Sequence, residues 1–440
     1  MAISADREQK FRQRFDEYAR TLDCVHCGLC IPDCPTYGIT GKEASSPRGR
    51  IYLMRGYAED NLELSSEVLR HLDECIVCRA CETVCPSGIR MGDMMESFRG
   101  MLDEKRTRKG LGYRLSRFLL RHVLPYRQRI AFLTDLMWLY ERLGLRRLVR
   151  LWAGRFAPRF AALDRLQPVV PPPAERRIET DSSLPSGYHP ALGKPRMRVA
   201  LFLGCIASEW FAPTHRATIR VLRRNGCDVL VPDAQTCCGA LHRHAGVLGE
   251  AEDLYRKNRE CFVDSGADVV VVNAAGCGAA LKDRPDSVPD GLGVPVRDVC
   301  ELLDEIGIVP PTGRIEKRVV YDAPCHLLHG QRIGKNVVED LLRQIPGLEL
   351  RDLPESDRCC GSGGVYNLVH PHLARPILDE KIAAIVSVEP DIVVTGNPGC
   401  VMQIRSGLDG TAVEVLHPIE LLDRSYGGPA FLTRHRNEVP

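Results

Sequence analysis

The chain has 440 residues, more than a single hydrophobic core ordinarily organises, so about two to four domains are expected. Its composition, 44% hydrophobic and 26% charged, excludes a disordered or fibrous protein, and a net charge of +2 gives no overall electrostatic footprint for nucleic acid. The polar N-terminus carries no apolar signal core, and no run of about 18 apolar residues occurs. We therefore expect a cytoplasmic protein that does not itself cross a membrane.

The most informative feature of the composition is its 19 cysteines. Thiols stay reduced in the cytosol and disulfides are rare there, so the natural use of so many cysteines is thiolate ligation of metal. Eight of them form two identical C-x2-C-x2-C-x3-C-P runs: Cys24, Cys27, Cys30 and Cys34 before Pro35, and Cys75, Cys78, Cys81 and Cys85 before Pro86. This spacing is that of bacterial ferredoxins with two 4Fe-4S clusters.

In such runs the first three thiolates bind one cluster and the fourth binds the other. The sequence therefore predicts one 4Fe-4S cluster held by Cys24, Cys27, Cys30 and Cys85, and a second held by Cys75, Cys78, Cys81 and Cys34. Structural zinc is the alternative for C-x2-C, but two identical runs with trailing prolines disfavour it. The intervening residues 47–73 have helical character, so residues 1–100 are expected to form an all-α two-cluster domain.

A basic segment and a proline-rich stretch follow, over residues 101–195. Residues 105–155 combine apolar residues with many Lys and Arg, opposed only by Asp135 and Glu141. One interpretation is binding to anionic lipid or an acidic partner, which implies peripheral association with the inner face of the cytoplasmic membrane. The other, which we favour, is the solvated face of a helical connector. Prolines in residues 168–195 predict an extended linker and a boundary near residue 195.

The remainder is a tandem repeat, residues 196–315 and residues 316–440 with the C-terminal tail. Each copy has a single cysteine, a vicinal pair followed by glycine, and another cysteine: Cys205, Cys237, Cys238 and Cys277, then Cys325, Cys359, Cys360 and Cys400. Short β-branched runs at 199–203, 228–231, 268–272, 318–321, 348–353 and 392–395 alternate with amphipathic stretches at 214–225, 249–265, 335–344 and 372–387. This alternation predicts two tandem α/β units with parallel strands.

Every one of these predicted strands runs into a cysteine or a cysteine pair. Because ligands bind beyond the carboxyl ends of parallel strands, four thiolates per unit are expected to form a metal centre, either iron-sulfur or zinc. The alternative, cysteines as small buried hydrophobes, does not explain their place after every strand. Packing does explain the remaining Cys227, Cys261 and Cys300. The neighbouring His26, His242 and His326 are not assigned as ligands.

A family resemblance rests on three segments and the two Cys-Cys-Gly repeats. Residues 24–28 (CVHCG), 34–37 (CPTY) and 46–53 (SPRGRIYL) resemble the iron-sulfur subunit of bacterial glycolate oxidase, and the likeness covers nearly the whole chain. This resemblance implies that the chain is the electron-transfer subunit of an oxidoreductase complex, a glycolate dehydrogenase. Partner subunits that contain flavin would oxidise glycolate to glyoxylate, and this chain would pass the electrons towards a quinone-linked acceptor.

Related systems leave alternatives open. The same motifs occur in subunits of lactate-utilising and glycerol-3-phosphate-oxidising complexes and of heterodisulfide reductase, and a non-redox scaffold or sensor is a further alternative. The heterodisulfide reductase pattern ends each unit in C-x-x-C, where this sequence has Ala280 and Gln403, which argues against thiol-disulfide chemistry. We find neither a G-x-G-x-x-G opening a βαβ unit nor a P-loop, so no catalytic residue is assigned. The chain alone is expected to have no substrate site.

Overall fold

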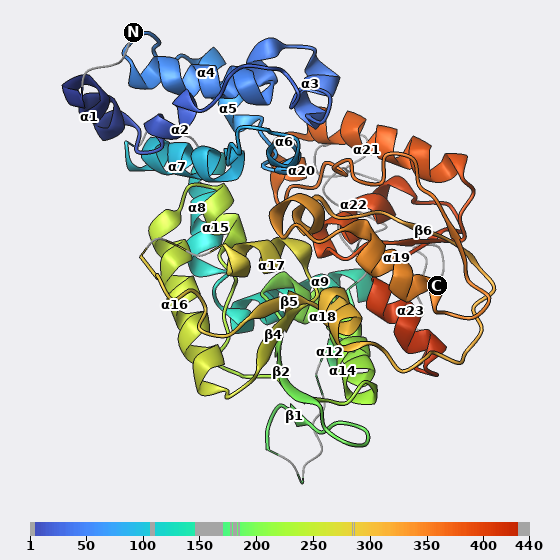
Figure 1. The fold of residues 1–440 in the computed structure, drawn as a ribbon. Helices are drawn as coiled ribbons and strands as arrows, with labels where there is room; N and C mark the ends of the chain where they lie inside the picture. The colour runs from blue at the N-terminus through green and yellow to red at the C-terminus, as the bar shows by residue number, and fades with distance from the viewer. Residues whose placement is uncertain are drawn as a thin grey trace. The chain divides into compact units, whose positions relative to one another are not determined.

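The computed structural model describes residues 5–105, 111–145, 170–176, 178, 183, 185–283, 285 and 287–429. The chain divides into two compact units (Figure 1). Unit 1 comprises Met1–Arg117, Ala240–Ala251 and Arg358–Lys381; unit 2 comprises Phe118–Gly239, Glu252–Asp357 and Ile382–Pro440. The division does not follow a simple cut along the chain, because two short segments of the cysteine-rich repeats fold with the N-terminal region.

Unit 1 is helical, and all strands of the described residues belong to unit 2. Its helices are α1 (Ala5–Arg14), α2 (Tyr18–Leu22), α3 (Pro35–Thr40), the 3-10 helix η1 (Glu43–Ser45), α4 (Pro47–Ala58), α5 (Ser66–Asp73), α6 (Ala80–Thr83), α7 (Met91–Glu104), α15 (Ala240–His244) and α20 (Tyr366–Val369). Three longer helices contain a unit boundary: α8 (Leu111–His122), α16 (Leu248–Asp264) and α21 (Pro371–Ser387). The predicted all-α N-terminal region is confirmed.

Helix α4 carries residues that line two cysteine-containing cavities of unit 1, and its sequence fixes where it begins. Ser46 caps it, its hydroxyl accepting a hydrogen bond from the Gly49 amide (3.0 Å), and Pro47 occupies the first helical position. A Cβ at Gly49 would lie 2.0 Å from the carbonyl oxygen of Glu43. Only glycine therefore lets α4 pack this closely against η1. This packing fixes the position of the following buried residues, Arg50 and Ile51.

Unit 2 contains two sheets that repeat one topology. The first consists of β1 (Tyr188–His189), β2 (Met197–Phe202), β3 (Cys227–Leu230), β4 (Val269–Val272) and β5 (Val296–Asp298), in the order β1-β3-β2-β4-β5. The second consists of β6 (Arg318–Tyr321), β7 (Glu349–Arg351), β8 (Ile392–Val394) and β9 (Glu414–Leu416), in the order β7-β6-β8-β9. All pairs are parallel except β1 with β3. Apart from β1, the two orders are equivalent, as expected of a duplicated unit.

The helices of unit 2 connect and cover these strands. They are α9 (Arg127–Arg142), α12 (Pro173–Arg176), α13 (Ile206–Trp210), α14 (Ala212–Arg224), α17 (Ala275–Lys282), α18 (Val299–Ile306), the π-helix η2 (His326–Gly330), α19 (Lys335–Arg343), α22 (Pro398–Gly407) and α23 (Pro418–Ser425). Side chains from both sheets, among them Val271, Val394 and Leu416, belong to one buried hydrophobic cluster. The six predicted strands and the predicted parallel α/β class are confirmed, and β1, β5 and β9 were not predicted.

The basic segment is described only in part. Helices α8 and α9 span residues 111–122 and 127–142, whereas residues 106–110, 146–169, 177, 179–182 and 184, which include part of the predicted linker, lie outside the described residues. On α9, Ile130 is buried and Thr134 accepts a hydrogen bond from the indole nitrogen of Trp210 (3.1 Å), while Phe132 and Leu136 are exposed. None of the helices in the described ranges combines the length and the apolar composition of a membrane span.

Candidate metal centres

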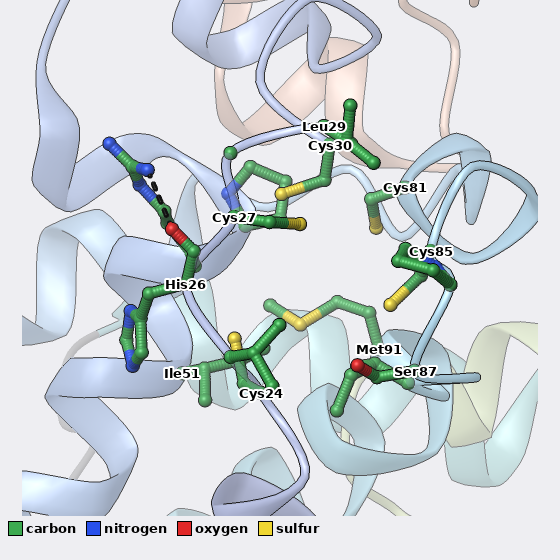
Figure 2. Close-up of a pocket in the computed structure, with 16 residues that line it drawn as sticks. Cys24, His26, Cys27, Leu29, Cys30, Ile51, Cys81, Cys85, Ser87 and Met91 are labelled. Atoms are coloured by element: carbon green, nitrogen blue, oxygen red, sulfur yellow. Dashed lines mark hydrogen bonds between the residues drawn. The ribbon is translucent and has the colours of Figure 1, made fainter.

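The first candidate site is a cavity in unit 1 of about 430 Å³, including the space open to solvent. Its lining contains Cys24, Cys27, Cys30 and Cys85, together with Cys81. Figure 2 shows these sulfur atoms gathered around one opening, with Ile51 and Met91 beside it and the ring of His26 turned away. Cys27 is the exposed cysteine of this lining, and the side chains of Val25 and Leu29 on either side of it in the sequence are also exposed.

The second candidate site, also in unit 1, measures about 390 Å³ on the same basis. Its lining contains Cys34, Cys75, Cys78 and Cys81, with Thr36, Arg50 and Arg79 among the polar neighbours. Cys81 lines both cavities, so the two sites are adjacent. The structure thus brings together each of the two quartets that the ferredoxin spacing pairs, including the crossing of Cys34 and Cys85 between the runs. Ligation of iron by them stays a prediction.

The backbone of both runs adopts the same unusual conformation. In the first, His26 has φ 54° and Gly28 has φ 88°; in the second, the equivalent Val77 and Arg79 have φ 61° and 66°. A left-handed conformation is costly for residues with a Cβ, most of all for a β-branched valine, and it persists only where its surroundings impose it. Reversing the chain in this way turns neighbouring thiols towards one centre, which is what binding a cluster within a seven-residue span demands.

Burial penalises charge on these thiols. It raises the pKa of Cys30 above the usual value and that of Cys81 well above it, and neighbouring cysteines add to the effect. Several thiolates around one cavity are therefore unfavourable unless a cation compensates them, and metal binding supplies that compensation while releasing the thiol protons. Over the described ranges, no three His, Cys, Asp or Glu side chains meet closely enough to hold a single metal ion.

The first Cys-Cys-Gly quartet lies in unit 2, beyond three neighbouring strands. Cys205 follows β2, Cys237 and Cys238 follow β3, and Cys277 lies in the first turn of α17 after β4. The Sγ atoms of Cys205 and Cys237 are 3.6 Å apart, and those of Cys238 and Cys277 are 3.2 Å apart. Gly239 has φ 80°, and its amide points at the Cys237 sulfur (3.5 Å). Glycine thus permits the turn that presents both members of the vicinal pair.

The second quartet is distributed over both units: Cys359 and Cys360 belong to unit 1, Cys325 and Cys400 to unit 2. All four are buried. The local geometry repeats that of the first quartet, because Gly361 has φ 82° and its amide lies 3.4 Å from the Cys359 sulfur.

Within unit 2, hydrogen bonds join the chain around the N-termini of α17 and α22, the helices that carry Cys277 and Cys400. The Ala275 amide donates to the carbonyl oxygen of Gly396 (3.1 Å), and the Gly276 amide donates to Oδ1 of Asn397 (3.3 Å). The Nδ2 of Asn397 in turn donates to the Cys400 sulfur (3.4 Å). The segments that carry the last cysteines of the two repeats are therefore joined through Asn397.

The three unassigned cysteines lie buried at the start of β3 (Cys227), in α16 (Cys261) and in α18 (Cys300), outside both quartets. One functional candidate was missed, Arg50, which lines the second cavity at 1% exposure. The signal was present, because Arg50 occupies the same helical face as Met54 and Tyr57, three and four residues apart along α4. A charged residue in that pattern indicates a buried cation that requires a partner.

Comparisons with known proteins agree with this organisation. Family models match residues 20–89 (4Fe-4S dicluster domain), residues 199–282 and 319–405 (Cysteine-rich domain) and residues 114–166 (Glycolate oxidase iron-sulfur subunit, linker region). The probable glycolate oxidase iron-sulfur subunit of Bacillus subtilis is 35% identical over 438 residues, 96% of this chain and 97% of that protein. The glycolate oxidase iron-sulfur subunit of Escherichia coli is 33% identical over 414 residues, 91% of this chain and 93% of that protein.

A more distant relative is a fumarate reductase (CoM/CoB) subunit of Methanothermobacter marburgensis, 29% identical over 94% of this chain and 74% of that protein. Similarity at 33% and 35% over nearly the full length of two relatives confirms the resemblance that the cysteine motifs indicated. The chain belongs to the family of glycolate oxidase iron-sulfur subunits.

Proposed function

We propose that this chain carries electrons within a complex that oxidises glycolate to glyoxylate, from a flavin-containing partner subunit towards a quinone-linked acceptor. The observation that carries the proposal is the pair of adjacent thiol-lined cavities in unit 1, which share Cys81. Two redox centres in such proximity suit the relay of single electrons. The choice of glycolate rests on the full-length similarity to the two glycolate oxidase subunits.

In this proposal Cys24, Cys27, Cys30 and Cys85 hold one 4Fe-4S cluster, and Cys34, Cys75, Cys78 and Cys81 hold the second. When bound, each cluster supplies a one-electron carrier whose potential depends on net charge, hydrogen bonds to sulfur and exposure. The chain itself presents the thiolates from loops with a left-handed backbone conformation and limits the access of water to the second cavity. We call the site in the first cavity the outer site and the site in the second cavity the inner site. Cys34 and Cys78 are buried, whereas Cys27 is exposed, so the two sites differ in access to solvent.

We further assign one metal centre, iron-sulfur or zinc, to each Cys-Cys-Gly quartet: Cys205, Cys237, Cys238 and Cys277, and Cys325, Cys359, Cys360 and Cys400. In the first quartet the sulfur atoms of two pairs lie 3.6 and 3.2 Å apart, which supports the centre assigned to that quartet. The buried Ala280 and Gln403 lie one turn beyond Cys277 and Cys400 on α17 and α22. Neither position supplies the further thiol of the heterodisulfide reductase pattern, which favours electron transfer over thiol-disulfide chemistry.

Expressing the chain with and without a candidate flavoprotein tests the proposed function. We expect the chain alone to accept electrons from a chemical reductant but to form no glyoxylate from glycolate, because the substrate site lies on the partner. The complex should form glyoxylate and reduce a quinone analogue. Lactate and glycerol-3-phosphate serve as matched substrates; a complex that prefers either of them, or turnover by the chain alone, would contradict the proposal.

A further inference from the structure

Arg50 is a buried cation at the wall of the second cavity. Its Nε donates to the carbonyl oxygen of His71 (2.7 Å) and its Nη2 donates to Oγ1 of Thr36 (3.0 Å). The remaining nitrogen, Nη1, points at the sulfur of Cys34 at 3.9 Å. The hydroxyl of Thr36 lies 3.3 Å from that same sulfur. The guanidinium is thus held by neutral groups in one orientation, with its third nitrogen directed at a predicted ligand.

The charge of Arg50 has no carboxylate to balance it. Among the described residues no Asp or Glu oxygen lies within ion-pair distance of it, whereas Arg79, the other arginine at this cavity, pairs with Glu82 at 3.1 Å. The buried Glu74 pairs instead with Arg70 at 3.3 Å. The polar contacts of the Arg50 guanidinium are the carbonyl oxygen of His71, the hydroxyl of Thr36 and the sulfur of Cys34. The one group among these partners that becomes anionic on binding a metal is therefore the sulfur of Cys34.

The first cavity has no equivalent. The arginine in its lining, Arg48, lies at the surface and pairs with Glu43 at 2.6 Å, while its Nη1 donates to the carbonyl oxygen of His26. Water and the acidic partner screen this charge, so its effect on the cavity is small. The two neighbouring sites thus differ by one buried, unbalanced positive charge.

We propose that Arg50 is a positioning residue that raises the reduction potential of the cluster held by Cys34, Cys75, Cys78 and Cys81 above that of its neighbour. Reduction adds one negative charge to a cluster, and a buried cation stabilises the reduced state more than the oxidised state. An electron that enters at the exposed site near Cys27 then moves to the inner site. This inference rests on the proposed function, since it requires both clusters.

Anaerobic redox titration followed by electron paramagnetic resonance tests the proposal. In Arg50→Met we expect the one-electron reduction constant of the inner cluster to fall at least about tenfold, a shift of about 59 mV, with the potential of the outer cluster unchanged. The variant Cys27→Ser, which alters the outer site, identifies which signal belongs to which cluster. Should Arg50→Met lose the inner cluster, Arg50→Gln, which is neutral but still donates hydrogen bonds, carries the same test.

Two matched variants separate charge from structure. Arg50→Lys keeps the charge and should retain most of the wild-type potential of the inner cluster. Arg55→Gln removes a partly exposed charge of α4 that pairs with Glu59, and it should shift the potential of neither cluster. If both clusters are present and neutral Arg50 variants leave the inner potential unchanged, this inference is wrong and the proposed function stands. If wild-type protein holds no cluster, both fail.

Discussion

Replacing Cys85 by serine is expected to remove the outer cluster and leave the inner one, so that the iron held by the two ferredoxin-type sites falls by about half. The physical reason is the crossing of the two runs: Cys85 belongs to the second run but lines the first cavity with Cys24, Cys27 and Cys30. Serine lacks the thiolate that the site requires. Iron analysis and electron paramagnetic resonance of the reduced, anaerobically purified variant measure the effect.

The reciprocal variant and a control make this result specific. Cys34→Ser should remove the inner cluster although Cys34 belongs to the first run, because it lines the second cavity. Cys261→Ser, which changes a buried cysteine of α16 outside every quartet, should retain all of the iron. If Cys85→Ser instead removed the signal that depends on Cys78, each run would hold its own cluster and the crossed assignment would be wrong.

Replacing Glu96 by glutamine is expected to lower the free energy of unfolding of unit 1 by about 3 kcal/mol. In this unit, Oε2 of Glu96 accepts from Arg243 (2.8 Å) and Oε1 lies 2.8 Å from Nδ1 of His244. Burial would raise the pKa of Glu96, but these two partners lower it from 4.5 to about 2. Neutral glutamine forfeits that interaction and removes the carboxylate that pairs with Arg243 at 2.8 Å.

The direction of the pH dependence follows from the lowered pKa of Glu96. Its stabilisation is complete above the unfolded-state value near 4.5 and is lost as the pH falls towards 2. The effect of Glu96→Gln should therefore be full at pH 7, where denaturant unfolding followed by circular dichroism and hydrogen exchange of residues 240–251 measure it. Glu252→Gln, which breaks an exposed pair with Arg256, should cost less than about 1 kcal/mol. Equal costs for the two variants would contradict this account.

Much of the fold was predictable because its signals are local. The four valines of β4 and the other β-branched runs indicate buried parallel strands, and α14, α16, α19 and α21 begin and end within two residues of the predicted stretches. Strands β5 and β9 were not predicted, because each has only three residues and these include charged ones, such as Arg297 in β5 and Glu414 in β9. The joining of residues 240–251 to unit 1 escaped because it depends on long-range pairs such as that of Glu96 with Arg243.

The candidate sites show the same contrast between local and long-range information. Cysteine spacing encodes a cluster site within a few residues, so both quartets of unit 1 could be predicted from the motif alone. Sequence spacing did not reveal the left-handed conformation of Val77, which only the closed loop imposes. The role of Arg50 was only half visible: its place on the face of α4 that carries Met54 and Tyr57 indicates burial, but only the packed structure shows that its Nη1 points at the sulfur of Cys34.

The most direct test of the central claim, that these thiolates bind iron, is to count iron and acid-labile sulfide in the anaerobically purified chain and to record its electron paramagnetic resonance spectrum after reduction. The account predicts brown protein with at least about eight iron atoms per chain and a paramagnetic signal that appears on reduction. Colourless protein without iron, and without a signal on reduction, would contradict it.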